Sequence, residues 1–335
     1  MSDQDKKTAV VLMNLGGPDS LDSVESFLFN LFYDRAIIDL PNPLRWMIAK
    51  FISKTRASHS REIYKKIGGF SPIIKETEKQ KLALEKVLKK RGSNVEIFIA
   101  MRYFHPMSKE VAKEIKSYNP DEIVLLPLYP QFSTATSLSS IMDIKKSLLD
   151  VGINKNPKTI CCYFDNENFI KAHVELIKKA IDGQNNVRIL FSAHGLPKKI
   201  IEKGDPYQWQ IEQTTEMVMK KITREDLEYK VTYQSKVGPV EWIGPDTEKE
   251  IEKAAIEGKT IVICPISFVS EHVETLVELD IEYAEIAKKL NAKYIRVETL
   301  GINENFIESL ADVVVESTKS RKCPEGFSKC VCAYE

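Results

Sequence analysis

Two kinds of hydrophobic pattern alternate along this chain. Short runs of apolar, often β-branched residues are separated by longer stretches in which apolar residues recur every three or four positions. The short runs are typical of strands buried on both faces, and the longer stretches are typical of amphipathic helices. Strands are predicted over residues 8–15, 95–101, 122–129, 159–164, 187–193, 229–235, 260–268 and 293–300. Long helices are predicted over 71–92 and 205–223.

The alternation of strands and helices predicts an α/β fold with parallel sheets covered by helices on both faces. The segments "VVLMNLGGP" and "RILFSAHGLP" are weakly similar, because each is a strand that ends in a glycine-containing turn with proline. We therefore expect one unit over residues 1–322, built from two similar halves at about 1–180 and 181–322. A cysteine-rich tail follows over residues 323–335.

Composition and charge narrow the classes of function. Basic and acidic residues are equal in number, 48 each, so no overall positive field is available to hold nucleic acid. No run of about 18 apolar residues and no signal or transit pattern is present, so we expect a cytoplasmic protein. Gly16-Gly17-Pro18 lacks both the Walker lysine and the GxGxxG pattern, so no nucleotide cofactor is expected.

His194 lies where an apolar strand turns into a loop, in the stretch "SAHGLP". In parallel α/β sheets, ligands bind at the carboxyl ends of strands. An imidazole titrates near neutral pH and can accept a proton there. A single histidine at a strand end is more often packed locally, so this stretch alone does not decide its role.

A row of carboxylates follows the strand predicted to end at Phe268. Its members recur at steps of three and four: Glu271, Glu274, Glu278, Glu282 and Glu285. Such spacing places like charges on one helix face, where they repel one another. A solvated acidic face is the ordinary interpretation, but lysines appear only after the row, at Lys288 and Lys289. With His272 at its start, the row could instead carry a cation or relay protons.

Two apolar segments are candidates for ligand or membrane contact. Trp242 lies between two Gly-Pro turns, either as a packed aromatic or as the flat wall of a ligand pocket. Residues 38–56 mix large apolar side chains with arginine and lysine. This segment is either a core helix or an apolar lip with a basic edge, of the kind that rests on membranes or admits greasy anionic ligands.

The tail is rich in thiols, with Cys323, Cys330 and Cys332 inside its last thirteen residues. Soft ligands in such a cluster favour zinc or an iron–sulfur centre, although unstructured tail thiols are the ordinary alternative. Cys161 and Cys162 are the candidates for a fourth ligand. Cys264 lies inside an apolar run and is interpreted as a buried small hydrophobe.

Taken together, these stretches resemble the ferrochelatases, which insert ferrous iron into a porphyrin. The matching segments are "LMNLGGP", "LFNLFYDRAIIDLP", "YKKIGGFSPI", "MRYFHP", "LYPQFSTATS", "FSAHGLP", "KGDPYQ", "YQSKVGPVEWIGPDT" and "PISFVSEHVETLVELDIEY". They span residues 9 to about 300 in the order of the family. The resemblance implies two Rossmann-like halves, each with a four-stranded parallel sheet flanked by helices, in the chelatase-like arrangement with an active cleft between them.

The resemblance also implies the reaction, insertion of Fe²⁺ as a substrate into protoporphyrin IX to give protohaem, the terminal step of haem biosynthesis. His194 matches the active-site histidine, Glu274 matches the glutamate that faces it, and His272 lies beside Glu274. His194 and Glu274 are thus also the expected contacts of the iron. Glu278 and Glu282 match an acidic relay along a π-type helix, whose roughly 4.4 residues per turn align steps of four.

Residues expected to contact the porphyrin follow from the same resemblance. Arg56, Tyr64 and Ser71 match positions that contact the propionates. Leu15 matches an apolar wall position that is Met or Tyr in other members, and Trp242 is a further candidate wall. Binding energy would bend the macrocycle, and His194 would accept its pyrrole protons. The alternatives are a coproporphyrin III ferrochelatase and a non-catalytic porphyrin or haem carrier.

Some bacterial members hold a [2Fe–2S] cluster on a C-x6-C-x-C tail, a spacing that Cys323, Cys330 and Cys332 reproduce. The usual internal ligand is missing, because "QFSTATS" contains no cysteine. Either Cys161 or Cys162 must then supply it, or the cluster is absent. The expected partners are protoporphyrin IX and ferrous iron. Peripheral contact of residues 38–56 with the inner face of the membrane and a homodimer are further hypotheses.

Overall fold

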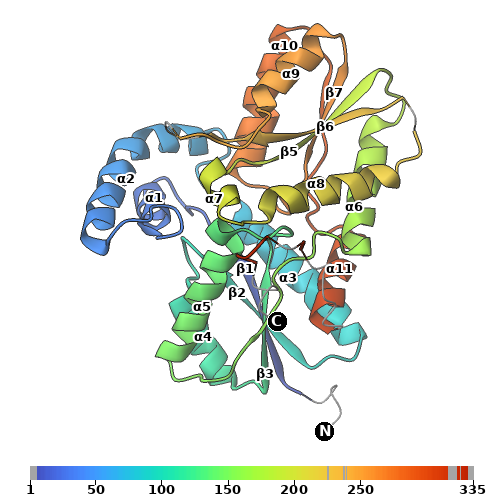
Figure 1. Ribbon diagram of the computed structural model, residues 1–335. Coiled ribbons are helices and arrows are strands. Elements are labelled where there is room, and N and C mark those ends of the chain that lie inside the picture. The colour runs from blue at the N-terminus through green and yellow to red at the C-terminus, as the bar shows by residue number, and fades with distance from the viewer. Residues whose placement is uncertain are drawn as a thin grey trace. The chain divides into compact units, whose positions relative to one another are not determined.

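The computed structural model describes residues 6–224, 226–236, 238, 240–315, 323–324 and 326–330. These residues form two compact units. The first comprises the described residues within 6–129, 133–161 and 310–315, and the second comprises those within 130–132, 162–309 and 323–330. Each unit contains one parallel four-stranded sheet with helices on both faces (Figure 1). The predicted fold class is therefore confirmed.

The sheet of the first unit has the strand order β2-β1-β3-β4. Its strands are β1 (Thr8–Asn14), β2 (Val95–Met101), β3 (Glu122–Pro127) and β4 (Lys158–Thr159). β1 is central and pairs in parallel on both sides, so that Val11 lies opposite Phe98 and Leu125. A strand in this position is covered on both faces, which explains why β1 is a continuous apolar run rather than an alternating one.

The helices of the first unit are α1 (Val24–Tyr33), α2 (Asn42–Lys65), α3 (Ile73–Lys90), α4 (Ser108–Tyr118), the π-helix η2 (Thr134–Leu138) and α5 (Ser139–Asp150), with α11 (Glu304–Val315) divided between the units. Of these, α3, α4 and α5 pack against the sheet. α4 and α5 bury Ile115 and Ile144 against one face (Figure 1). α3 buries Leu84 and Leu88 on the opposite side, four residues apart on one helix face.

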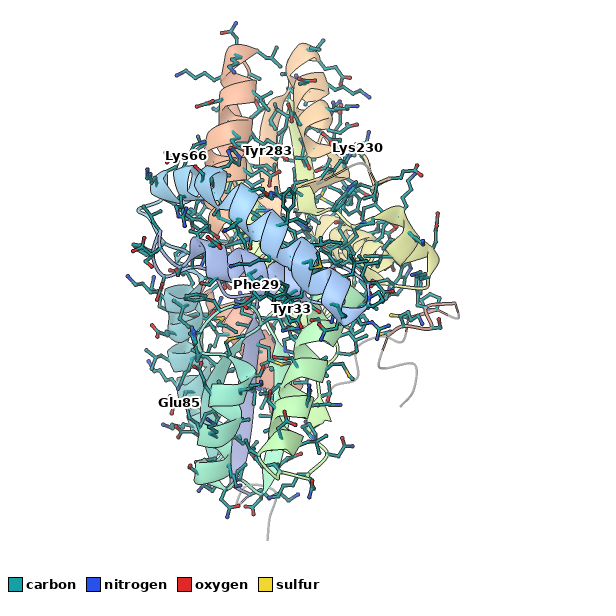
Figure 2. The ribbon with its side chains drawn as sticks, turned by 90° about the vertical axis from the view of Figure 1, so that its left-hand side faces the viewer. Phe29, Tyr33, Lys66, Glu85, Lys230 and Tyr283 are labelled. Carbon is teal, nitrogen blue, oxygen red and sulfur yellow. The ribbon has the colours of Figure 1, made fainter. Side chains whose placement is uncertain are left out.

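α2 lies against α1 and exposes a large apolar surface. Figure 2 shows this long helix at the front, with Phe29 and Tyr33 of α1 labelled beside it. The Phe29 ring stacks on Tyr33 with centroids 5.4 Å apart and meets Trp46 edge-on at 6.4 Å. Trp46, Met47 and Phe51 are nevertheless exposed. The core-helix interpretation of this segment is therefore wrong for these side chains.

The sheet of the second unit has the order β6-β5-β7-β8. Its strands are β5 (Val187–His194), β6 (Glu228–Gln234), β7 (Thr260–Pro265) and β8 (Tyr294–Arg296). The first strand in chain order is again central, with the second on one side and the third and fourth on the other. The two sheets therefore repeat one connectivity.

The helices of the second unit are α6 (Glu167–Ile181), α7 (Lys198–Glu202), α8 (Tyr207–Lys220), α9 (Thr247–Ile256), the π-helix η3 (Glu274–Glu282) and α10 (Tyr283–Lys289). Ile251, Leu279 and Ala287 bring α9, η3 and α10 into one core with Leu190 and Ile263 of the sheet. α6 packs against α8, and these two helices contact β7 and β6, respectively (Figure 1). Among the described helices, none is long and apolar enough to cross a membrane.

Several predicted strands are too long. Residues 260–268 and 293–300 were expected to be strands, but β7 ends at Pro265 and β8 contains only Tyr294–Arg296. Residues 159–164 were also expected to form a strand, but β4 contains only Lys158 and Thr159. β4 is an edge strand that pairs with β3 alone, and the chain then leaves the sheet, where the Tyr163 amide donates to the Pro130 carbonyl at 2.9 Å. The remaining apolar side chains of this run are buried without being in a strand, a distinction that hydrophobicity alone does not make.

Candidate active site

His194 and Glu274 form a hydrogen-bonded pair in the second unit. His194 is the last residue of β5, where it lies opposite Gln234, the last residue of β6. Glu274 is the first residue of η3. The imidazole Nδ1 lies 3.1 Å from the carboxylate Oε2, and the side chains are 36% and 27% exposed. The pair therefore sits at the carboxyl end of the sheet, where ligands bind in this class of fold.

The two groups shift each other's pKa in opposite directions. Burial lowers the pKa of His194, but the carboxylate of Glu274 outweighs it, so this pKa lies above its ordinary value. Burial raises the pKa of Glu274, but the imidazoles of His194 and His272 outweigh it, so this pKa lies below the usual carboxyl range. The coupling therefore favours an imidazolium that faces a carboxylate.

His272 is buried and lies near the same carboxylate oxygen as His194. Its Nδ1 donates to the Ser270 carbonyl at 3.1 Å. This bond turns Nε2 toward Glu274 Oε2, at 3.7 Å. The ring of Phe268 packs against the imidazole with centroids 4.7 Å apart. Glu274 thus has two imidazoles near one carboxylate oxygen, which favours its ionised form.

The loop after His194 is held close to Trp242. A side chain at Gly195 would place its Cβ 3.0 Å from the Gln234 carbonyl oxygen and 3.2 Å from Trp242 Cε3, so only glycine fits without a shift. The Ile243 amide donates to the Leu196 carbonyl at 2.9 Å, which ties the tryptophan segment to this loop. The indole therefore lies beside the catalytic histidine candidate.

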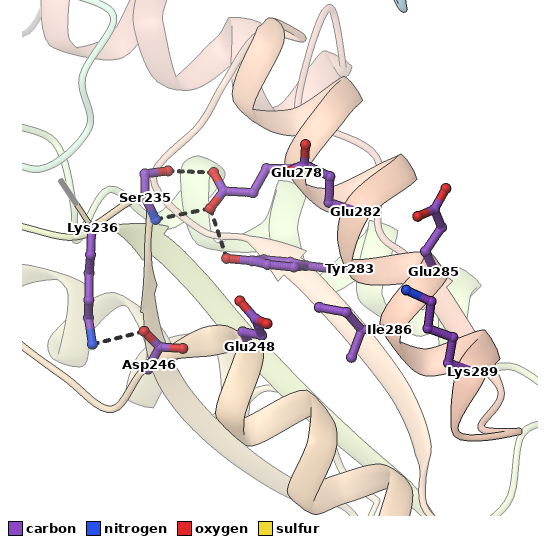
Figure 3. Close-up of a pocket in the computed structure, with 10 residues that line it drawn as sticks. All are labelled: Ser235, Lys236, Asp246, Glu248, Glu278, Glu282, Tyr283, Glu285, Ile286 and Lys289. Atoms are coloured by element: carbon purple, nitrogen blue, oxygen red, sulfur yellow. Dashed lines mark hydrogen bonds and ion pairs between the residues drawn. The ribbon is translucent and has the colours of Figure 1, made fainter. Parts of the chain in front are cut away.

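Glu278 lies one step along η3 and accepts hydrogen bonds from four neutral donors. Gln234 Nε2 donates at 2.9 Å. The Ser235 amide donates at 3.0 Å, the Tyr283 hydroxyl at 2.8 Å, and the Ser235 hydroxyl is the fourth donor (Figure 3). Burial first, and then the charge of Glu274, nevertheless raise the pKa of Glu278, so this carboxyl is suited to hold a proton. Sequence reasoning missed the donors Gln234 and Ser235, at the end of β6.

A cavity of about 380 Å³ opens beside Glu278. Glu282, on the same helix, and Glu248, at the start of α9, also line it (Figure 3). Lys236 forms an ion pair with Asp246 on its wall, with Nζ and Oδ2 2.9 Å apart. Glu282 is exposed, whereas Glu278 is partly buried in the wall of the same cavity.

Glu271, the first carboxylate of the row, is compensated by a cation. Arg296 Nη1 lies 2.5 Å from Glu271 Oε1, and the Thr275 hydroxyl donates to Oε2 at 2.6 Å. Despite burial, the charge of Arg296 lowers the pKa of Glu271. The acidic row is therefore less unbalanced than helical spacing indicated, because its counter-charge lies on β8.

The predicted porphyrin contacts of the first unit lie in two places. Leu15, which follows β1, is half-buried, and Ser71 is buried. A Cβ on Gly17 would come within 2.5 Å of Ser71 Cβ, so glycine lets these two segments touch. Tyr64 is buried and Arg56 exposed, about two turns apart on α2. The Arg56 guanidinium lies over the Phe32 ring, 5.7 Å from its centroid.

Comparison with known proteins identifies the family. A sequence model of the ferrochelatases matches residues 7–318. Ferrochelatase from Rickettsia bellii is 56% identical over 98% of this chain and 95% of its own. The chain belongs to the ferrochelatase family. Ferrochelatase from Pelagibacter ubique is 47% identical, over 97% of this chain and 98% of its own.

Solved structures agree with this family membership at the level of the fold. The sirohydrochlorin chelatase SirB from Bacillus subtilis subspecies spizizenii, in complex with cobalt, matches with a TM-score of 0.55 at 10% identity, over 93% of this chain and 95% of that one. CbiX, the terminal enzyme for siroheme biosynthesis in denitrifying bacteria, matches with a TM-score of 0.51 at 10% identity, over 94% of this chain and 100% of that one. This ferrochelatase-family chain therefore has the chelatase-like architecture that its sequence predicts.

Two of the cysteines considered for an iron–sulfur cluster converge on one side chain. Gln210 Nε2 donates to Cys323 Sγ at 3.2 Å and to Cys162 Sγ at 3.5 Å. Cys161 belongs to the first unit and Cys162 to the second, together with Cys323. Cys330 is buried. Cys332 lies outside the described residues, among which no group of three or more Cys, His, Asp or Glu is arranged to hold a metal ion.

Cys264 behaves as a buried hydrophobe. It is fully buried in β7, and burial raises the pKa of its thiol. The nearest polar group is His173 Nδ1, 3.9 Å from the sulfur. Burial lowers the pKa of His173 to about 3, so that imidazole is neutral and does not favour a thiolate. Cys162, unlike Cys264, shares the Gln210 contact with Cys323 of the tail.

Proposed function

We propose that this protein inserts ferrous iron into protoporphyrin IX and releases protohaem and two protons. The observation that carries the proposal is the His194–Glu274 pair, with its 3.1 Å contact at the carboxyl end of β5. The reaction needs a proton acceptor and an oxygen ligand for a hard cation at one place. Family membership supports the reaction class, and this pair supplies both groups.

The reaction breaks two pyrrole N–H bonds, and the two electron pairs remain on nitrogen to bind iron. Glu274 raises the pKa of His194 and so favours the protonated imidazole. In that form, His194 can accept a pyrrole proton only after its own proton has left. A dication at Glu274 would lower the pKa of His194 by repulsion and by competing for the carboxylate. Binding of iron at Glu274 would thus favour the neutral form of His194, which can accept a proton.

The relay for the released protons is the carboxylate row. Glu278 has a raised pKa, so it can take a proton that leaves the His194–Glu274 pair. Glu282 lines the same cavity and is exposed to solvent. Protons would therefore pass through Glu274 to Glu278 and then to Glu282. Glu274 would hold each proton only during the transfer, and His272 would favour its return to the ionised form, in which it contacts the iron together with His194.

We expect several apolar and polar side chains to bind the porphyrin. Leu15 and Trp242 offer apolar surface to the macrocycle, and Arg56 offers a charged donor to a propionate. The buried Ser71 and Tyr64 hydroxyls add neutral donors for the same groups. Binding energy of this kind can be used to bend the ring and expose its nitrogen lone pairs.

The exposed apolar face of α2 favours protoporphyrin over the more polar coproporphyrin. Trp46, Met47 and Phe51 are exposed, and Lys50 and Lys54 lie among them in sequence. Such a surface could contact either an apolar porphyrin or the headgroup region of a membrane. We accordingly propose peripheral attachment through residues 38–56 to the inner face of the membrane.

Insertion with purified protein and ferrous iron, kept anaerobic and followed by absorbance, tests the proposed function. Protoporphyrin IX and coproporphyrin III are compared as substrates at equal concentration. The proposal predicts catalytic turnover, with a preference for protoporphyrin of about tenfold or more in kcat/KM. Faster turnover of coproporphyrin III would indicate that the protein is a coproporphyrin ferrochelatase. Tight porphyrin binding without turnover would instead indicate a carrier.

We also propose a [2Fe–2S] cluster held by Cys162, Cys323, Cys330 and Cys332. The shared contact of Cys162 and Cys323 with Gln210 supports this ligand set. Such a cluster would supply a one-electron redox centre. Protein purified anaerobically should contain about two acid-labile sulfides per chain. Cys162→Ala should abolish them, whereas Cys161→Ala should retain them; the reverse result would assign Cys161.

A further inference from the structure

The amino-acid sequence of the acidic segment does not itself explain what holds this segment in a π-helix. A π-helix is rare, and nine consecutive residues of it, Glu274–Glu282, form a long example. Like charges at neighbouring positions destabilise a helix further. A compensating interaction is therefore required, and β8 supplies it.

Tyr294 and Arg296 are two residues apart on β8, so their side chains lie on the same face of the strand. Their partners on β7, Ile261 and Ile263, belong to the core that packs against η3. Both β8 side chains therefore face the π-helix, and each makes a polar contact with it.

Arg296 holds two carboxylates at once. Its Nε and Nη2 donate to the two oxygens of Asp280 at 2.7 and 2.8 Å, and Nη1 lies 2.5 Å from Glu271 Oε1. Glu271 precedes the π-helix and Asp280 lies within it. The Thr299 amide also donates to Glu271 Oε1, at 3.2 Å. One guanidinium thus fixes both the entry to the helix and a point farther along it.

This double contact depends on the winding of the helix. The α-helix has 3.6 residues per turn and the π-helix about 4.4, so α-helical winding from Glu274 would rotate Asp280 by roughly 110° farther round the axis. The Asp280 carboxylate would then leave Arg296 while Glu271 stayed in place. The contact to both carboxylates therefore stabilises the π-helical form specifically.

Tyr294 acts where the π-helix ends. The Tyr283 amide donates to the Glu278 carbonyl, five residues earlier, and α10 begins at Tyr283. A change from five-residue to four-residue spacing leaves one carbonyl without a helical donor. The next carbonyl, that of Leu279, accepts a hydrogen bond from the Tyr294 hydroxyl at 2.7 Å. Tyr294 thus satisfies a backbone group at the junction.

We propose that Arg296 and Tyr294 are positioning residues, which keep residues 274–282 in π-helical winding and thereby align Glu274 and Glu278. The contribution of this alignment to catalysis rests on the proposed function above. The effect on the winding does not, because it can be measured in the absence of substrate.

Arg188 provides a matched control on the same sheet. It lies on β5, its Nε donates to Glu228 at 2.9 Å, and it also pairs with Glu257. Its side chain is 12% exposed, compared with 15% for Arg296. Arg188→Met therefore removes a similar two-carboxylate contact that does not involve η3.

Amide hydrogen exchange, measured by mass spectrometry on substrate-free protein, tests the effect on the helix. Arg296→Met should raise exchange in residues 274–283 by about tenfold or more, with little change in β5, whereas Arg188→Met should leave 274–283 unchanged. Tyr294→Phe keeps the ring and should give a smaller, severalfold rise around residues 279–284. Unchanged exchange of η3 in both Arg296→Met and Tyr294→Phe would overturn the proposal. An equal rise in Arg188→Met would also overturn it.

Kinetics of iron insertion separate positioning from the proposed function. Arg296→Met should lower kcat by about tenfold or more with little change in the KM for porphyrin, since misaligned catalytic groups affect the chemical step. Arg296→Lys, which keeps the charge but loses the bidentate fork, should restore part of kcat. Faster exchange with an unchanged kcat would contradict the catalytic part of the proposal. Wild-type protein without turnover would contradict the proposed function and leave the exchange test of the winding valid.

Discussion

Each unit of this molecule has a π-helix soon after the third of its strands in chain order. η2 (Thr134–Leu138) follows β3, and η3 (Glu274–Glu282) follows β7, in sheets of the same connectivity. The side chains differ, because η2 has the sequence TATSL and η3 has ETLVELDIE. A shared topology therefore places a widened helix at the same edge of both sheets, and only the second one carries carboxylates.

Each unit also contains a histidine–glutamate pair, and the two pairs differ in exposure. His105, after β2, lies 2.9 Å from Glu110, and His194, at the end of β5, lies 3.1 Å from Glu274. The first pair is 63% and 47% exposed, whereas the second is 36% and 27% exposed. Solvent screens the exposed pair, so contact distance does not distinguish them but burial does. Matched substitutions in the two pairs can test whether this difference matters.

The largest effect is expected for Glu274→Gln, which keeps the shape of the side chain and removes its charge. Without the carboxylate, His194 loses the partner that raises its pKa and iron loses an oxygen ligand. We expect kcat for iron insertion to fall by about 10²- to 10⁴-fold. Glu110→Gln should change it by less than about twofold. Comparable losses in both variants would remove the distinction between the pairs.

A smaller effect is expected for the relay. The double variant Glu278→Gln/Glu282→Gln should lower kcat by about tenfold, because protons must then leave by a less favourable path. Glu285→Gln, in the wall of the same cavity, is the control and should remain within about twofold of wild type. Steady-state rates at saturating porphyrin and iron make the comparison. An unchanged rate in the double variant would show that η3 does not conduct the protons.

The smallest effect concerns stability and its dependence on pH. Arg296→Met should lower the free energy of unfolding by about 2–4 kcal/mol at pH 7, because two partly buried carboxylates lose their cation. Arg296 lowers the folded-state pKa of Glu271, so this stabilisation is present above the unfolded value of about 4.3 and is lost as pH falls through the folded value. Urea unfolding of both proteins at pH 7, 4 and 3 should therefore show a difference that is unchanged above about pH 4.3 and shrinks below it. A constant difference would mean that the lost stability is due to packing rather than charge.

The fold could be predicted from the sequence largely because its strands are buried on both faces. β2 occupies the predicted residues 95–101, and the central strands β1 and β5 differ from prediction by one residue at one end. The expectation failed at 159–164, where apolar residues are buried outside a sheet. The exposure of the apolar side chains of α2 could not be predicted either, because such side chains occur both in a protein core and on an exposed binding surface.

The candidate site was less accessible to sequence reasoning, and the reason is distance along the chain. His194 and Glu274 stand out because each occurs at a strand or helix end with a distinctive composition. The donors to Glu278 come from Gln234 and Ser235, more than 40 residues earlier. The cation that compensates Glu271 is Arg296, on the strand beside β7. Helical periodicity describes one face of one segment and contains no information about these neighbours.

The most direct test of the account is the rate of ferrous iron insertion into protoporphyrin IX by wild-type protein, His194→Ala and His105→Ala under identical anaerobic conditions. The account predicts turnover by wild type, a loss of about 100-fold or more in His194→Ala, and a rate within about twofold of wild type in His105→Ala. A near-normal rate in His194→Ala would contradict the central role given to the His194–Glu274 pair.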